Sequence, residues 1–139
     1  MIRKGTYALF LHIPCDTTVR IGSLGESTFY EGHYCYVGSA MAGLDQRLNR
    51  HLSKDKRLRW HIDFLTIMSD DMYAYESSGD FIEECDLANL LTDSGAIPAV
   101  EGFGCSDCDC HTHLFSVEPS DIERILVENG LTKFVPKIK

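Results

Sequence analysis

The stretch HYCYVGSAMAGLDQRLNRHL, residues 33–52, decides the fold, because its pattern changes from that of a strand to that of a helix. Its first part, HYCYVGSA at 33–40, predicts a strand. In its second part Leu44, Leu48 and Leu52 repeat every four residues, which predicts an amphipathic helix. A strand that leads directly into a helix indicates a domain built from both kinds of element.

Further elements are predicted on both sides of this stretch. Strands are predicted at 5–13 (GTYALFLHI, ended by Pro14), 19–24, 72–77 (MYAYES) and 113–118 (HLFSVE), and helices from an N-cap at Asp80 to about Leu91 and from Ser120 to Gly130. Residues 60–65, WHIDFL, fit a helix or a strand, and residues 92–109 predict a long ordered loop. We therefore expect one α/β (α+β) domain over 1–139, in which the early strands pair as antiparallel hairpins.

Composition limits the classes of function. The chain has 139 residues and a net charge of −8, so its average field repels phosphate backbones and argues against tight nonspecific DNA binding. One basic patch nevertheless lies between residues 47 and 59, and Arg50, Lys54, Arg57 and Arg59 are its predicted nucleic-acid contacts.

The location of the protein is also predicted from the sequence. The apolar run near the start is too short for a secretory signal, and no run approaches the about 20 residues of a membrane-spanning helix. We expect a cytoplasmic protein that does not enter the membrane, with its six cysteines as thiols or metal ligands.

The helix after YVG carries candidate chemistry beside its leucines. Arg47, His51 and Lys54 form a stripe at i, i+4 and i+7. A guanidinium there could grip a phosphate, and a histidine one turn later could move a proton. The alternative is a solvated basic face, and the helix pattern alone leaves both open.

The helix around residue 84 places a carboxylate on its apolar side. With Glu84 at zero on a helical wheel, Leu91 falls near −20° and Ala88 near +40° (roughly, at 100° per residue). A buried carboxylate must be paired, neutralised or bound to metal. Glu84 is therefore either half of a structural ion pair with a core arginine or a metal-binding or catalytic group.

The stretch CSDCDCHTH, residues 105–113, suggests a metal centre of its own. Cys105 and Cys108 with His111 or His113 could reach a tetrahedral zinc ion. Structural zinc sites usually join two distant ligand pairs, and the other cysteines, Cys15, Cys35 and Cys85, lie in or beside apolar elements. Zinc is therefore the less favoured interpretation.

Four features in order resemble the GIY-YIG nuclease superfamily: GTY at 5–7, YVG at 36–38, an arginine eleven residues after Tyr36, and an acidic residue on a later helix. The runs YVGSAMAGL, RLNRHL, WHIDFL, ECDLA and GFGCSDCDCHTHLF look like a small, uncharacterised branch of that superfamily. Members of the branch are stand-alone proteins or are joined to a DNA-repair glycosylase of the endonuclease III type.

The resemblance implies a fold and a set of site residues. The fold is a small, mainly antiparallel three-stranded sheet flanked by helices, to which this chain adds a C-terminal strand and helix in residues 114–139. The catalytic residues carried over by the motifs are Tyr7, Tyr36, Arg47, His51 and Glu84. In this scheme Glu84 holds one Mg²⁺ or Mn²⁺, the tyrosines and His51 activate or orient water, and Arg47 neutralises charge on the phosphate.

The resemblance also gives residues 92–113 a place. Cys108, Cys110 and His113 match the branch pattern, and Cys105 and His111 are additional. This Cys/His loop is thus a candidate lid or second shell over the cleft, or a separate site. Three functions remain open: a metal-dependent nuclease in DNA repair or processing; a catalytically weak domain that binds nucleic acid, such as DNA, or a repair glycosylase; and a zinc-binding or redox protein.

Overall fold

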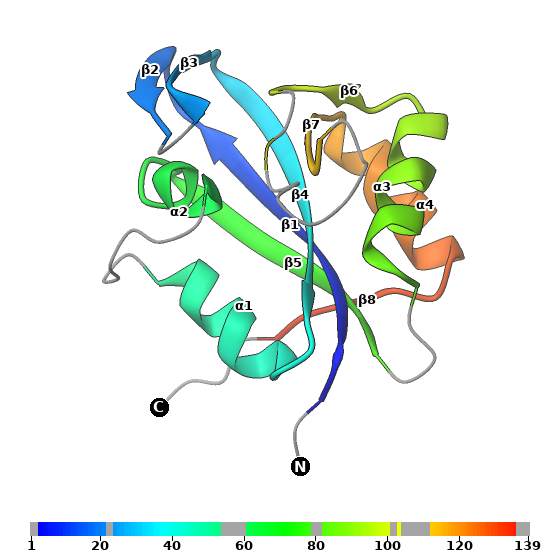
Figure 1. Ribbon diagram of the computed structural model, residues 1–139. Helices are drawn as coiled ribbons and strands as arrows, with labels where there is room; N and C mark the ends of the chain where they lie inside the picture. The colour runs from blue at the N-terminus through cyan, green and yellow to red at the C-terminus, as the bar shows by residue number, and fades with distance from the viewer. Residues whose placement is uncertain are drawn as a thin grey trace.

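The computed structural model describes residues 3–21, 24–53, 61–78, 82–100, 103 and 112–135. The strands are β1 Gly5–Ile13, β2 Thr17–Arg20, β3 Glu26–Phe29, β4 Gly32–Ala40, β5 Asp71–Ser78, β6 Ile97–Pro98, β7 Leu114–Ser116 and β8 Thr132–Lys133. The helices are α1 Leu44–Leu52, α2 His61–Thr66, α3 Glu84–Asp93 and α4 Pro119–Glu128 (Figure 1).

The main sheet has six strands in the order β6-β7-β4-β1-β5-β8, and every neighbouring pair is antiparallel. The predicted α+β class is therefore confirmed. The three long strands β4, β1 and β5 form the expected centre, and the short strands β6, β7 and β8 widen it beyond the expected three. The hairpin of β2 and β3 is a separate two-stranded sheet.

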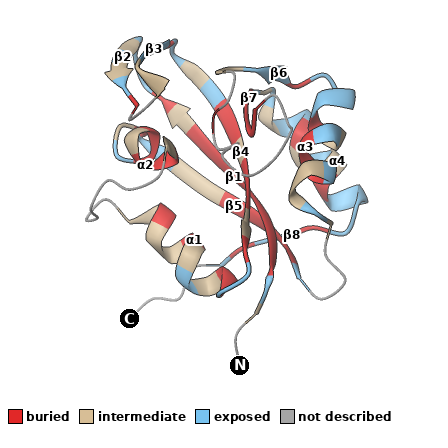
Figure 2. Cartoon of the chain, in the orientation of Figure 1, coloured by how far each residue is buried: buried red, intermediate tan, exposed pale blue. Residues whose placement is uncertain are grey.

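Strand β1 is buried on both faces, which explains why its sequence is apolar almost throughout (Figure 2). One face, with Tyr7, Leu9 and Leu11, packs in a core that includes residues of α1 and α2. The other face, with Ala8 and Phe10, packs in a core with α3 and α4. The helices thus cover the sheet in two pairs, one pair on each face (Figure 1).

Several boundaries differ from those predicted. The strand expected at 19–24 is β2 at Thr17–Arg20, where alternating burial makes a weak sequence signal. The ambiguous 60–65 segment contributes to α2. The expected 92–109 loop begins inside α3 and contains β6, which is held to β7 by backbone pairing rather than by apolar burial. Within the described residues, no helix is long and apolar enough to cross a membrane.

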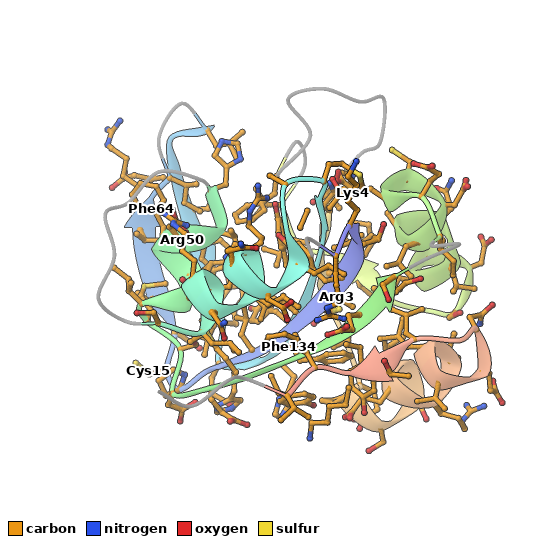
Figure 3. All side chains as sticks on the ribbon, turned by 90° about the horizontal axis from the view of Figure 1, so that it is seen from below. Arg3, Lys4, Cys15, Arg50, Phe64 and Phe134 are labelled. Carbon is orange, nitrogen blue, oxygen red and sulfur yellow. The ribbon has the colours of Figure 1, made fainter. Side chains whose placement is uncertain are left out.

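Helices α1 and α2 are joined by an ion pair. Both guanidinium nitrogens of Arg50 bond to Asp63, Nη1 at 2.7 Å and Nη2 at 2.9 Å, and the Asp63 side chain is fully buried. Arg50 lies where α1 meets α2 (Figure 3). Because losing one partner would leave a buried charge alone, the pair fixes how the two helices pack.

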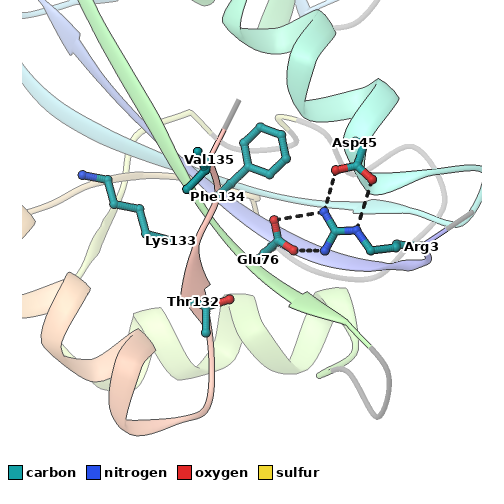
Figure 4. A pocket seen from close by; sticks show the side chains of 7 residues that line it. All are labelled: Arg3, Asp45, Glu76, Thr132, Lys133, Phe134 and Val135. Atoms are coloured by element: carbon teal, nitrogen blue, oxygen red, sulfur yellow. Dashed lines mark hydrogen bonds and ion pairs between the residues drawn. The ribbon is translucent and has the colours of Figure 1, made fainter. Parts of the chain in front are cut away.

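A second arginine links the start of the chain to the same helix. The Arg3 guanidinium bonds to Asp45 of α1, with Nη2 2.6 Å from Oδ1, and also to Glu76 of β5 (Figure 4). These groups line an open pocket of about 550 Å³ together with β8 and the two residues after it. Two carboxylates surround one guanidinium there, so Arg3 acts as a structural tie.

Candidate active site

Tyr7 and Gly38 face each other across β1 and β4 and show why the second motif ends in glycine. They are paired in the strand register. A Cβ atom on Gly38 would lie 2.3 Å from the Tyr7 hydroxyl oxygen and 2.4 Å from Cζ. The Tyr7 ring therefore lies directly over Gly38, in space that any other residue at position 38 would occupy.

Helix α1 brings His51 to the same tyrosine. His51 Nε2 is 2.7 Å from the Tyr7 hydroxyl oxygen, and the two ring centroids are 5.3 Å apart. Both residues are only 1% exposed. Burial raises the pKa of Tyr7 well above its ordinary value, and the neighbouring Tyr36 raises it further, so Tyr7 keeps its proton. The two side chains therefore form a buried hydrogen bond between a protonated phenol and an imidazole.

Arg47 lies between the tyrosine and the carboxylate. Its Nη1 donates to the backbone oxygen of Ser39 at 3.1 Å, which anchors the side chain to β4. Its charge and hydrogen bonding partly offset the rise in the pKa of Tyr7, and its charge also lowers the pKa of Glu84. One guanidinium therefore acts on both groups, as a phosphate-binding arginine in this position would need to.

Tyr36 completes an aromatic cluster on this face of the sheet. Its ring centroid is 6.3 Å from Tyr7 and 6.3 Å from His51, and it meets Phe103 edge to face at 5.8 Å. Phe103 in turn contacts the ring of His61 at 5.5 Å, and burial lowers the pKa of His61. Tyr36 is half-buried, so solvent reaches it and does not reach Tyr7.

Glu84 approaches the cluster from the other side of the sheet. It lies in the first turn of α3, where a carboxylate is favoured by the helix dipole, and Oε1 is 3.0 Å from Nδ1 of His113. Burial raises the pKa of Glu84, but the adjacent polar groups of His113 and Ser39 and the charge of Arg47 lower it by more. Its carboxyl is therefore ionised at neutral pH, and the side chain that contacts Oε1 is a histidine rather than the arginine considered from the sequence.

The position of Glu84 corrects the basis on which the sequence selected it. The predicted helix began after an N-cap at Asp80, whereas α3 begins at Glu84 with Glu83 as the N-cap. Leu87, Ala88 and Leu91 are buried as expected, but Glu84 is at the end of the helix, not in the middle of a continuous apolar face.

The site has two layers. The side chains of the inner layer are almost fully buried: Tyr7, His51 and His113. The side chains of the outer layer are half-buried and reach solvent: Tyr36, Arg47 and Glu84. The outer layer offers a cation, an anion and a phenol to a ligand, and the inner layer holds and polarises them.

Two residues of this arrangement were not predicted as site residues. Ser39 bonds to Arg47 through its backbone and to Glu84 through its side chain. Alternation along β4 turns Ser39 away from the face of Tyr36, and that period-two pattern is the signal that could have identified it. Phe103, from the run GFG at 102–104, has no signal of its own, because an isolated aromatic residue in a loop predicts nothing.

Other predicted residues lie elsewhere or outside the described residues. Arg50 has an internal partner in Asp63, so its nucleic-acid contact stays a prediction. Lys54, Arg57 and Arg59 of the basic patch and Cys105, Cys108, Cys110 and His111 of the Cys/His loop lie outside the described residues. Of the more distant cysteines weighed as zinc ligands, Cys35 is fully buried in the core beside α3 and α4, where burial raises its pKa.

Comparison with known proteins gives one match. The sequence model of a family described as a domain of unknown function, DUF123, matches residues 6–134. No curated protein and no solved structure matches the chain.

Proposed function

We propose that this chain, which belongs to the DUF123 family, is a metal-dependent nuclease that hydrolyses phosphodiester bonds by the chemistry of the GIY-YIG superfamily. The observation that carries the proposal is the meeting of side chains from β1, β4, α1 and α3 around the contact of Tyr7 with His51. The sequence motifs alone name these side chains.

The outer layer suits a phosphate and a divalent ion. The described residues contain no group of three or more His, Cys, Asp or Glu side chains placed to hold a metal ion. Mg²⁺, however, is commonly held by one or two carboxylates together with water and substrate phosphate. The ionised, half-buried Glu84 next to Arg47 fits that mode. When bound, the ion would supply Lewis-acid stabilisation of the phosphate and the leaving oxygen.

The protein's own groups supply the rest of the chemistry. Arg47 binds the phosphate and neutralises charge that develops on its oxygens. Tyr36, which solvent reaches, orients the attacking water. The Tyr7 hydroxyl donates a hydrogen bond to Nε2 of a neutral His51, so His51 is the group that can take up a proton behind the site.

The test is a cleavage assay on branched, flapped and lesion-bearing DNA with Mg²⁺ or Mn²⁺, and on RNA for comparison. We expect metal-dependent cleavage that disappears in Arg47→Ala and Glu84→Ala. Arg124→Ala is a matched control, because Arg124 is an exposed arginine of α4 that forms a 3.8 Å surface ion pair with Glu128. Absence of cleavage on every substrate, or cleavage that survives both site substitutions, contradicts the proposal.

A second function is favoured by the burial of the inner layer. Tyr7 and His51 are each 1% exposed, so a nucleic acid could be bound at the outer layer without access to the proton-transfer pair. The chain would then be a binding domain for DNA or for a repair glycosylase. Binding of the same DNA substrates or of a glycosylase without cleavage, unchanged in His51→Ala, would select this function over catalysis.

A further inference from the structure

His113 is the buried residue through which the end of the Cys/His loop meets the site. Its side chain is 0% exposed, and its Nδ1 is 3.0 Å from Oε1 of Glu84. It comes immediately before β7, outside any described helix or strand. Glu84 is 29 residues earlier in the chain, so the contact joins two separate parts of the fold.

The backbone of His113 is fixed on both sides. Its N–H donates to the carbonyl oxygen of Phe103 at 2.9 Å, and its own carbonyl accepts from the N–H of Val37 at 2.9 Å. The first bond ties it to the residue that packs against Tyr36, and the second ties it to β4. A histidine held in this way has little freedom to turn its ring away from Glu84.

The contact restrains a carboxylate that would otherwise be mobile. A glutamate in the first turn of a helix loses considerable rotamer freedom when it is held in one direction. Glu84 keeps 28% of its side chain exposed, so the restraint does not bury it. Ser39 holds the same carboxylate from β4.

We propose that His113 is a positioning residue, which holds Oε1 of Glu84 through Nδ1 and so aims the carboxylate at the divalent ion. The inference rests on the proposed function, in which Glu84 binds that ion. It follows that the affinity for the metal depends on His113, a residue outside the four motif elements.

Three substitutions separate the hydrogen-bond donor from the volume of the ring. His113→Asn places an amide N–H close to the position of Nδ1. His113→Gln has the same amide one bond further out, near the position of Nε2, and His113→Leu fills the space with no donor. Asn and Gln form the decisive pair, because they differ in where the donor lies and not in its chemistry.

The experiment measures Mn²⁺ binding to the full chain by electron paramagnetic resonance of the free ion, with no nucleic acid present. We expect His113→Gln and His113→Leu to bind about 10- to 100-fold more weakly than the wild type, as loss of an outer partner usually causes. His113→Asn should bind within about threefold of the wild type if it keeps that outer partner. Circular dichroism checks the fold, and if His113→Leu does not fold, the Asn and Gln pair still decides.

Two results overturn the inference: equal affinity in the wild type and His113→Leu, or His113→Asn binding no tighter than His113→Gln. Glu84→Gln provides the baseline. A wild type that binds no tighter than Glu84→Gln removes the metal site of the proposed function and the inference with it. A wild type that binds through Glu84, with all residue-113 variants equal to it, removes the inference alone.

Discussion

Two clusters in this fold each contain tyrosines and a glutamate, and the two are built differently. On the α3 and α4 face, the hydroxyls of Tyr73 and Tyr75 donate to the two oxygens of Glu123, at 2.9 and 2.7 Å. In the candidate site, the hydroxyl of Tyr7 contacts His51 on the α1 and α2 face, and Glu84, which comes from α3 on the other face, is held by His113 and Ser39.

The difference lies in the partners of the tyrosines and the glutamate, not in the residue types: one cluster is a structural brace and the other is the candidate site. Each oxygen of Glu123 already has a tyrosine hydroxyl, and Tyr73 stacks on Phe10 with a centroid distance of 5.1 Å. That cluster joins α4 to β5. In the other cluster a cation, Arg47, acts on both the tyrosine and the glutamate, and Glu84 reaches solvent. Only this cluster has the charges that a phosphate would meet.

Exchange of each glutamate for glutamine gives the largest contrast. Glu84→Gln should reduce cleavage about 1,000-fold, because several kcal/mol of metal-based stabilisation is lost, with little change in the free energy of unfolding. Glu123→Gln should leave cleavage unchanged and cost about 2 kcal/mol of stability, because one tyrosine hydroxyl then faces an amide N–H. Initial rates and urea unfolding measure the two effects. Equal rates in both variants would remove the distinction between the clusters.

Removal of one hydroxyl from each cluster is the next test. Tyr7→Phe should slow cleavage about 100-fold, the usual contribution of a proton-transfer group. Tyr75→Phe should lower the free energy of unfolding by about 1 kcal/mol and leave the rate unchanged. A Tyr7→Phe protein with the wild-type rate would give Tyr7 a packing role only.

The packing of the Tyr7 and Tyr73 rings can be tested by changing the residues beneath them, Gly38 and Phe10. Gly38→Ala should destabilise the fold by about 1–3 kcal/mol, because the new methyl group collides with the Tyr7 ring, and should slow cleavage by moving that ring from His51. Phe10→Leu removes the ring under Tyr73 and should lower the free energy of unfolding by about 1 kcal/mol without changing the cleavage rate. Thermal unfolding with parallel rate measurements compares them. A Gly38→Ala protein as stable as wild type would show that the Tyr7 ring is not held in this position.

The smallest expected effect is on the alkaline titration of Tyr75, which bonds to Glu123. Burial, and then the hydrogen bond to Glu123, raise the pKa of Tyr75 to about 12, whereas an unfolded tyrosine titrates near about 10. A raised folded pKa gives stability that is complete below the unfolded pKa and is lost as pH rises through the folded one. Absorbance at 295 nm should show Tyr75 titrating at lower pH in Glu123→Gln, with Tyr75→Phe as the control. An unchanged titration would mean that burial alone sets this pKa.

The sequence was most informative where burial and periodicity are strong. Strand β1 matches its predicted range because it is apolar on both faces, and Leu44 and Leu48 of α1 are buried as their spacing predicted. The strands β3, β6 and β8 gave no signal, because they are short and backbone pairing, not side-chain pattern, holds them.

The sequence predicted most residues of the candidate site, but it did not predict which of them are buried and which reach solvent. The motifs named Tyr7, His51 and Glu84, but the helical wheel placed Glu84 on a buried face, whereas it is half-buried, and the stripe with Arg47 did not show that His51 is buried. The contact of His113 with Glu84 depends on the path of α3 and β7 in space, which pairs residues that no local pattern connects. The sequence did name His113, both as a possible zinc ligand and as part of the branch pattern in the Cys/His loop.

The alternation of β1 between two faces constrains where the chain can change in length during evolution. One residue inserted within Gly5–Ile13 would turn Tyr7 toward α3 and α4 and present Ala8 to His51. The apolar side chains of β1 would then face the wrong cores, and the candidate site would lose its tyrosine hydroxyl. Insertions in the separate hairpin of β2 and β3 leave the pairing of β1 with β4 intact. We expect length variation among family members to occur mainly in residues 14–31 and to be rare inside β1 and β4.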